Sequence, residues 1–324
     1  MSKTIKILLA VLVVQIGFYL AVSQDRHRVR TKQPFLTVDT SEVNYIKIVN
    51  EDGELVMNRV GNQWKMKKPI EYPANQSYVR TLLEKLARLR IETEVTTNPD
   101  KFPLYELDEL GAKYVEVGAT GSRIDSFYCG KTSESYTHTY LRRAGSNHVL
   151  LVSGTPRSSF TRKPEQWRDK KILALDRSLI EQIDLEFPDQ TVELVRRITT
   201  PQEDTTLTAA DTSWTAIPEK GGEFEPDKKV MNRILNTLKR LNAIDFIDQA
   251  TGEVPDFSHP DFTVEVHLEG DQHEKIEFIP KPDNENRWIA RRNEDDSTVF
   301  VVYKSSVNNL KKDPNALKGK KDEK

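Results

Sequence analysis

The chain has 324 residues, enough for about two domains at roughly 100–200 residues each. Hydrophobic residues make up 37% of it and charged residues 30%, which is the composition of a folded rather than a disordered chain. The 48 basic and 50 acidic residues leave a net charge of −2. This balance excludes the usual nucleic-acid-binding protein, which needs an excess of positive charge to neutralise phosphates.

The chain begins with an apolar segment. Residues 5–22 are apolar apart from Lys6 and Gln15. In a helix, which rises about 1.5 Å per residue, they are long enough to cross a hydrocarbon core of about 30 Å. We therefore predict that residues 1–23 are an N-terminal anchor, which makes the chain a single-pass protein of the inner (cytoplasmic) membrane. The segment ends in AVS, a small–x–small pattern, so a cleaved signal peptide is the alternative.

Two features of this segment favour opposite sides of the membrane for the bulk of the chain. The basic residues of "RHRVRTK", at 26–32, outnumber Lys3 and Lys6, which favours a cytoplasmic position for the bulk of the chain. A short N-terminal tail before one span and a large domain is, in contrast, typical of export. We predict a periplasmic or otherwise extracytoplasmic bulk that follows a basic linker at residues 24–40, and the cytoplasmic alternative stays open.

After the linker, the sequence contains an internal duplication. Trp64 and Trp214 lie 150 residues apart, and each precedes a loop and an amphipathic segment. The apolar residues of the two segments align at an offset of 152 and have the i, i+3, i+4, i+7 spacing of one buried helical stripe. The aligned residues are Val79, Leu82, Leu83, Leu86 and Leu89 in the first copy, and Met231, Ile234, Leu235, Leu238 and Leu241 in the second.

Strand-like blocks repeat in the same order around these helices. After the helix, "VEV" and "VLLV" of the first copy match "VEV" and "VFVV" of the second at offsets of 149 and 150. Before the tryptophan, the block that begins at Ser41 resembles the block that begins at Ser178, at an offset of 137. The second copy therefore carries an insertion, which we place in a surface loop or small hairpin at "TTPQEDTTLTAADT".

The late blocks of the first copy are short strands separated by glycine-containing turns, and we place these strands at residues 113–118, 123–129, 137–143 and 148–152. They must pair antiparallel, because a parallel crossover needs about a dozen residues. We predict an α+β fold of two tandem duplicated units, each an antiparallel sheet with one main packed helix, after an N-terminal transmembrane helix.

The predicted units are separated and followed by shorter segments. Between them, Trp167 and its aliphatic neighbours require burial, which indicates a structured connector. The chain end has no apolar periodicity, which indicates disorder. The predicted boundaries are residues 41–160 for the first unit, 161–177 for the connector, 178–310 for the second unit and 311–324 for a disordered charged tail.

The sequence contains no motif for catalysis or cofactor binding. Its six histidines lack the HExxH or i, i+4 spacing of a helical metal site, and GxGxxG, GxxxxGK[ST] and GxSxG are absent. Cys129, the one cysteine, lies in an alternating strand, which favours packing. We predict a chain that is not an enzyme, with no catalytic residue, metal, cofactor or nucleic-acid partner. A hydrolase that uses carboxylates or Cys129 is the weakest alternative.

Two kinds of side chain are candidates for partner contacts. The tryptophan of each copy precedes the helix, which favours core packing over stacking on a sugar ring. The double arginines place one guanidinium on each face of a strand, where salt bridges are the simpler interpretation and an anionic partner is the alternative. The candidate partner or ligand contacts are Trp64, Trp214, Arg142, Arg143, Arg291 and Arg292.

The motifs "YIKIVNEDGELVMNRVGNQWKM", "YVRTLLEKLARLR", "LYELDELGAKYVEV" and "WRDKKILALDRSLIEQIDLEF" follow the apolar segment in this order. The pattern resembles the bacterial family called domain of unknown function 4340, over about residues 5–305. Tyr105, Leu107 and Asp108 match the Tyr-Gly-Leu-Asp turn of that family, and Glu106 replaces its glycine. The resemblance implies a single-span accessory protein of ABC-type transport systems, including those related to gliding motility, and it supplies no catalytic residues.

We therefore expect a non-enzymatic, membrane-anchored accessory or scaffold protein of an ABC-type transport or envelope complex. Residues 5–22 would hold it in the membrane, and its partners would be proteins of that complex. The alternative is a module that binds envelope glycans through Trp64, Trp214 and the paired arginines.

Overall fold

The computed structural model describes residues 32–37, 39–119, 124–199, 211–247 and 254–319, together with Gln15. The rest of the predicted anchor, the start of the basic linker and most of the predicted insertion lie outside these residues. Within the described part of the chain, no helix is both long and apolar enough to cross a membrane. The chain divides into two compact units between Asp169 and Lys170.

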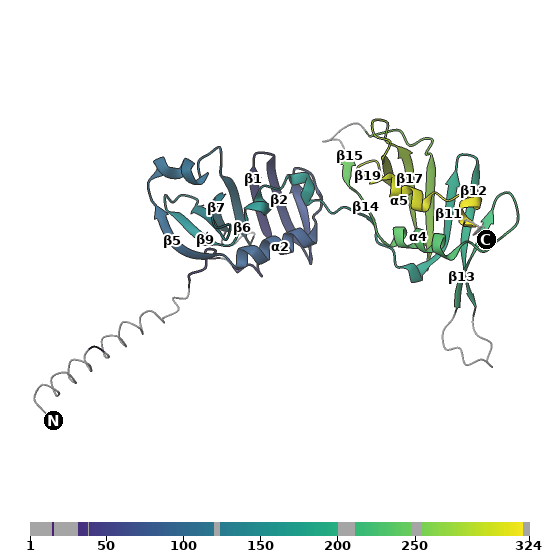
Figure 1. Ribbon diagram of the computed structural model, residues 1–324, viewed down its shortest axis with the longest axis horizontal. Helices are drawn as coiled ribbons and strands as arrows, with labels where there is room; N and C mark the ends of the chain where they lie inside the picture. The colour runs from purple at the N-terminus through teal and green to yellow at the C-terminus, as the bar shows by residue number, and fades with distance from the viewer. Residues whose placement is uncertain are drawn as a thin grey trace, which may run out of the picture. The chain divides into compact units, whose positions relative to one another are not determined.

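The first unit is a nine-stranded antiparallel sheet with helix α2 (Gln76–Ala87) against one face (Figure 1). Its strand order is β4-β3-β2-β1-β6-β7-β8-β9-β5. The strands are β1 (Tyr45–Asn50), β2 (Gly53–Val60), β3 (Gln63–Lys68), β4 (Tyr72–Pro73), β5 (Arg90–Thr96), β6 (Lys113–Gly118), β7 (Ile124–Thr132), β8 (His138–Arg143) and β9 (Val149–Ser153). Short helical turns are η1 (Pro99–Tyr105), α3 (Arg157–Phe160) and η2 (Pro164–Trp167).

The second unit is an eight-stranded antiparallel sheet in the order β13-β12-β11-β16-β17-β18-β19-β15, with a separate pair β10-β14. Its strands are β10 (Lys171–Leu173), β11 (Ile180–Phe187), β12 (Gln190–Thr199), β13 (Asp211–Pro218), β14 (Leu241–Asn242), β15 (Asp245–Ile247), β16 (Phe262–Leu268), β17 (Gln272–Pro280), β18 (Arg287–Arg292) and β19 (Val299–Tyr303). Its helical segments are η3 (Arg177–Leu179), α4 (Lys228–Lys239), α5 (Lys304–Leu310) and α6 (Pro314–Leu317).

Local sequence explains why these elements form. Alternate residues of β1 are buried, as the period of two in a sheet with one covered face requires. Helix α2 buries Val79, Leu82 and Leu86 of the predicted stripe, whereas Leu83 is only partly buried and Leu89 lies beyond the end of the helix. The side chain of Asn75 caps the helix by accepting the backbone N–H of Tyr78. Helix α4 begins in the same way, because Asp227 accepts the N–H groups of Lys229 and Val230.

The two sheets share one strand order, apart from the added β4 edge of the first. Equivalent residues also pair in equivalent registers: Ile46 lies opposite Val117 in the first sheet, and Ile183 lies opposite Val266 in the second. The predicted α+β class with large antiparallel sheets is therefore confirmed. The four late strands predicted for the first copy are present, each within a few residues of its predicted ends.

The first unit begins earlier than predicted. Part of the proposed basic linker packs into the unit: Phe35 is 0% exposed, and Pro34 forms a β-bridge with Arg90. The same pairing occurs in the second unit, where Lys171 of β10 lies opposite Asn242 of β14. The apolar residue that follows each of these positions, Phe35 or Ile172, pulls the segment into the core.

The predicted connector is not one element. Its first half ends the first unit, because the backbone N–H of Asn75 donates to the carbonyl of Trp167 at 2.7 Å. Its second half, from Lys170 onward, begins the second unit with strand β10. Trp167 itself is 1% exposed and packs edge-on against the ring of Tyr78.

The start of the predicted tail is folded, which corrects the prediction of disorder from residue 311. Helix α6 begins at Pro314 and buries Leu317, which is 0% exposed. The N–H of Asp227 donates to the carbonyl of Leu317 at 2.8 Å, as that of Asn75 does to Trp167. Lack of periodicity misled the prediction, because a single buried residue and one backbone hydrogen bond fix this turn.

We expect Leu317→Ala to destabilise the second unit by about 2–5 kcal/mol, the usual effect of removing a fully buried leucine side chain. Urea unfolding followed by intrinsic fluorescence measures this change. Asn315→Ala, at an exposed position of the same short helix, is the matched control and should leave the midpoint unchanged. Equal midpoints for the two variants would show that α6 does not contribute to the core.

Candidate functional site

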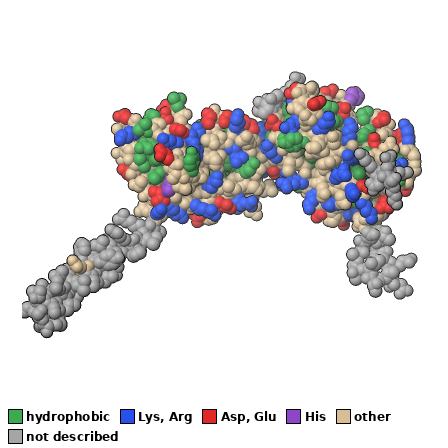
Figure 2. All heavy atoms as spheres, viewed as in Figure 1, with side chains coloured by type: hydrophobic (Ala, Val, Ile, Leu, Met, Phe, Trp, Pro, Cys, Tyr) green, Lys and Arg blue, Asp and Glu red, His purple; other side chains and the backbone are tan. Residues whose placement is uncertain are grey.

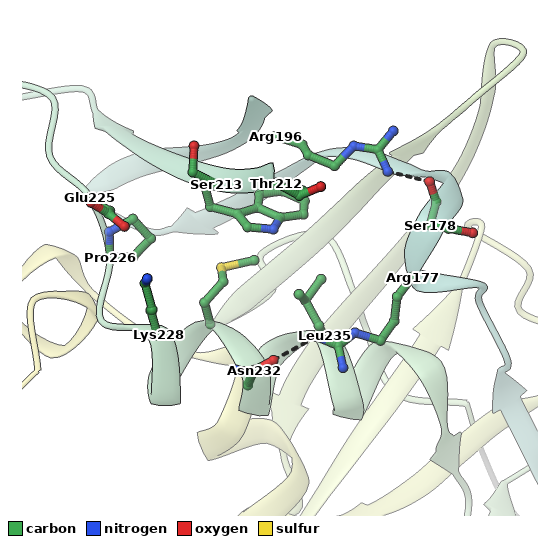
Figure 3. A pocket seen from close by; sticks show the side chains of 12 residues that line it. Arg177, Ser178, Arg196, Thr212, Ser213, Glu225, Pro226, Lys228, Asn232 and Leu235 are labelled. Carbon is green, nitrogen blue, oxygen red and sulfur yellow. Dashed lines mark hydrogen bonds between the residues drawn. The ribbon is translucent and has the colours of Figure 1, made fainter. Parts of the chain in front are cut away.

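The second unit contains a pocket between strand β13 and helix α4, with a volume of about 790 Å³ (Figure 3). This volume lies within the range of roughly 300–1,000 Å³ that small-molecule sites occupy. The residues that line it are Arg177, Ser178, Arg196, Thr212, Ser213, Trp214, Glu225, Pro226, Lys228, Met231, Asn232 and Leu235.

The pocket has an apolar part and a polar rim. Trp214, Met231 and Leu235 supply the apolar surface. Figure 3 shows Lys228, Asn232 and Leu235 rising from α4, with Thr212 and Ser213 on the strand across from them. In the same view, Arg196 and Ser178 stand at one end, and Glu225 and Pro226 stand at the other.

Three cations line the pocket against one carboxylate. The guanidinium of Arg177 donates to the side-chain oxygens of Asn232, at 2.7 Å, and Asn236, at 3.2 Å, and so ties the segment before β11 to α4. Arg196 donates to the backbone carbonyl of Ser178. Lys228 is exposed at the first turn of α4. The rim therefore carries a local positive charge that the balanced composition of the chain does not reveal.

A capped turn positions Arg177. Asp176 accepts both the backbone N–H and the hydroxyl of Ser178, and these two hydrogen bonds hold the pKa of the Asp176 carboxyl below its ordinary value. The first unit has the same turn at the equivalent position, where Asp39 accepts from the N–H and hydroxyl of Ser41. The residue between the acid and the serine differs, and it is Arg177 only in the second unit.

In the first unit, the equivalent strand and helix are joined by a side chain. Gln76 accepts the backbone N–H of Trp64 at 2.8 Å and donates to its carbonyl at 2.9 Å. Ala74 adds a second donor to that carbonyl, at 3.0 Å. Trp64 is 6% exposed and belongs to the core of the unit, so the structure places it where core packing was the favoured prediction.

In the second unit, both of these partners are replaced. Lys228 stands at the position of Gln76 and has no acceptor atom, and Pro226 stands at the position of Ala74 and has no N–H. In the described part of the chain, no side chain accepts from the Trp214 N–H as Gln76 does from Trp64. Trp214 is 9% exposed, so it is buried as Trp64 is, and core packing holds for both rings; Trp214 differs in that it also lines the pocket.

The paired arginines lie on equivalent sheet positions and make internal contacts. The guanidinium of Arg142 lies 4.5 Å from the Phe102 ring and 4.3 Å from the Tyr128 ring, and burial lowers its pKa. Arg291 forms an ion pair with Glu277 at 2.7 Å, and the hydrogen bond that it donates to Glu277 raises its pKa. Both arginines are thus engaged with their own unit.

The second arginine of each pair binds an acid on the neighbouring strand. Arg143 contacts Asp125 at 3.2 Å and donates to the carbonyl of Phe35. Arg292 forms an ion pair with Glu274. Burial opposes ionisation of Glu274 more than any single contact favours it, but the hydrogen bonds from Arg292 and Asn293 and the charge of Arg292 together leave its pKa below the ordinary value. The arginine pairs are not among the residues that line the Trp214 pocket, and their role as partner contacts stays a prediction.

The remaining charged surface is mixed. On the face shown in Figure 2, acidic and basic side chains are interspersed over both units. In the described ranges, no group of three or more histidine, cysteine or acidic side chains is placed to hold a metal ion. Sequence analysis missed Arg177, Arg196 and Lys228, and the signal that could have revealed Arg177 and Lys228 was the failure of aligned positions to match between the copies.

The duplicated α+β units, with one basic pocket in the second, define the architectural class of the chain. Residues 64–257, more than half of the chain, match the family described as Domain of unknown function (DUF4340). The chain therefore belongs to this family, as the sequence motifs predicted. Comparisons with curated proteins and with solved structures find no match.

Cys129 allows a test of whether the chain offers a reactive thiol. It is fully buried, and burial raises the pKa of its thiol to about 12. At pH 8 we expect a thiolate fraction of about one in ten thousand, against about a quarter in an unfolded chain with a pKa of about 8.5. A colorimetric disulfide reagent should therefore react at least a hundredfold more slowly with the native chain than with the chain in guanidinium. Similar rates in the two states would contradict the buried position.

Proposed function

We propose that the chain is a non-enzymatic, membrane-anchored accessory or scaffold protein of an ABC-type transport or envelope complex. The observation that carries this proposal is the divergence of two otherwise equivalent units at one surface. Gln76 closes the gap between strand and helix in the first unit, whereas the second keeps a basic pocket in the same place. A unit that serves only as structure gains nothing from this change.

Three further observations support this proposal. The family to which the chain belongs is described by no activity, so it supplies no catalytic residues. The thiol of Cys129 is buried and its pKa is raised, which makes it a poor nucleophile at neutral pH. The apolar segment at residues 5–22 supports attachment to the membrane, where such complexes lie.

Purification of the tagged, full-length protein from its own host in a mild detergent, followed by mass spectrometry, tests the accessory role. We expect permease or ATPase subunits of an ABC-type system to co-purify. A chain in which residues 1–23 are replaced by an unrelated anchor is the matched control, and it shows whether the membrane segment or the folded units make the contact. A protein that is recovered alone and in good yield would remove the main support for this proposal.

The extracytoplasmic position of the folded units is a second part of the proposal. Alkaline phosphatase fused after Lys324 should be active, because this enzyme needs the disulfides that form outside the cytoplasm. A green fluorescent protein fused at the same point is the matched control and should be dark if exported through the general secretion route. The opposite pattern would place the units in the cytoplasm, as the basic residues at 26–32 favour.

Glycan binding is the second candidate function, and one observation favours it. Trp214 lines a pocket that also contains hydroxyl and amide side chains, the groups that usually contact sugars. Trp64 is a core residue whose backbone is held by Gln76, so glycan binding would be confined to the second unit. Binding of envelope glycan fragments that is lost in Trp214→Phe would favour this candidate over the scaffold.

A further inference from the structure

The pocket of the second unit has the composition of an anion site on an apolar base. Arg177, Arg196 and Lys228 line it, and Glu225 is the one acid that does so among the residues that the structure describes. Guanidinium and ammonium groups donate hydrogen bonds and accept none, so they favour oxyanions. Beneath them, Trp214 and Met231 belong to the apolar lining. An oxyanion alone would leave that apolar surface uncovered.

The backbone adds a donor of its own. In the first unit, the N–H of Trp64 is satisfied by the amide oxygen of Gln76 at 2.8 Å. At the equivalent position of the second unit, Lys228 offers only donors. A backbone N–H without an acceptor is costly unless water or a ligand supplies one. The Lys228 ammonium favours an acceptor with negative charge, and a ligand that supplies one beside Trp214 would replace the acceptor that Gln76 provides in the first unit.

The first unit serves as an internal reference for this arrangement. Its residues at the positions of Arg177 and Lys228 are Thr40 and Gln76, so it lacks two of the three cations. The third cation, Arg196, has Arg59 as its counterpart, and each arginine lies opposite its tryptophan across the strand pair. The second unit thus differs from the first by two added positive charges and by the loss of the side chain that accepts the tryptophan N–H, and Arg177, Lys228 and Trp214 all line the same pocket.

We propose that this pocket binds an amphiphilic oxyanion, a phosphate or carboxylate group carried on a ring or apolar chain. The oxyanion contacts Lys228 and the arginines of the rim, and the ring or chain covers Trp214 and Met231. This site goes beyond the proposed accessory function, because it takes a small ligand and does not depend on any protein partner. An anionic lipid and a soluble phosphorylated or carboxylated metabolite share this chemistry.

Phenyl phosphate is a suitable probe, because it combines both halves of the proposed ligand. We expect it to bind the full-length protein in nanodiscs of phosphatidylcholine at least tenfold more tightly than inorganic phosphate, the anion alone, or phenol, the ring alone. Isothermal titration calorimetry measures the three affinities. Equal affinity for phenyl phosphate and inorganic phosphate, or the absence of measurable binding up to 10 mM, roughly the weak end of specific recognition, would overturn the proposal.

Substitutions that copy the first unit into the second give the sharper test. Lys228→Gln removes a cation and restores the side chain that holds the tryptophan N–H in the first unit, and Arg177→Thr removes another cation. We expect each to weaken phenyl phosphate binding at least tenfold. Lys228→Gln should leave the thermal midpoint unchanged, because Lys228 is exposed, whereas Arg177→Thr should lower it slightly, because Arg177 donates to Asn232 and Asn236. Arg59→Gln, in the first unit, is the matched control and should bind as the unaltered chain does. Unchanged binding by both Lys228→Gln and Arg177→Thr would reject this site.

The source of the natural ligand is settled by competition. If nanodiscs that contain phosphatidylglycerol weaken phenyl phosphate binding to the unaltered chain, and this effect is absent in Lys228→Gln, the site takes a lipid headgroup. If phosphatidylglycerol has no effect, the ligand is soluble. Co-purification of transport subunits with Lys228→Gln separates the two proposals: a complex that persists without ligand binding retains the accessory function on its own.

Discussion

In each unit, the N-cap residue of the main helix donates a backbone hydrogen bond to a short turn at the end of the unit. The bond joins Asn75 to Trp167 in the first unit and Asp227 to Leu317 in the second. It fixes where the helix begins, and therefore where the next residue, Gln76 or Lys228, stands relative to the tryptophan strand. The identity of that one residue then decides whether strand and helix are bridged or left apart.

The bond also explains why the repeat extends beyond the blocks that sequence comparison aligned. A helix N-terminus has backbone N–H groups without intrahelical partners, and the N-cap side chain satisfies only some of them. The backbone N–H of the capping residue also needs an acceptor, and the turn at 164–167 or 314–317 supplies a carbonyl for it. The turn therefore belongs to the same folded unit as the helix whose N-terminus it contacts. For this reason, residues 164–167 are not part of a linker and residues 314–317 are not part of a disordered tail.

The main helices and most strands could be predicted from the sequence, because their hydrophobic patterns are long and periodic. Five apolar residues at helical spacing identify α2, and alternation with glycine turns identifies the four late strands. The segments that were misjudged are short, and each is fixed by one buried side chain such as Phe35 or Leu317. A single residue has no period, so only an alignment of 33–36 with 170–173, and of 164–167 with 314–317, could have revealed them.

The candidate site was hidden for a different reason. The sequence search looked for residues that the two copies share, and this search favours the common core: Trp64 is core, and each arginine pair is engaged with acids or rings of its own unit. A duplicated fold constrains both copies in the same way wherever a residue supports the fold. Function specific to one copy must then lie where the copies differ. Lys228 is such a position, because it lines the pocket of the second unit where Gln76 of the first unit binds the tryptophan backbone.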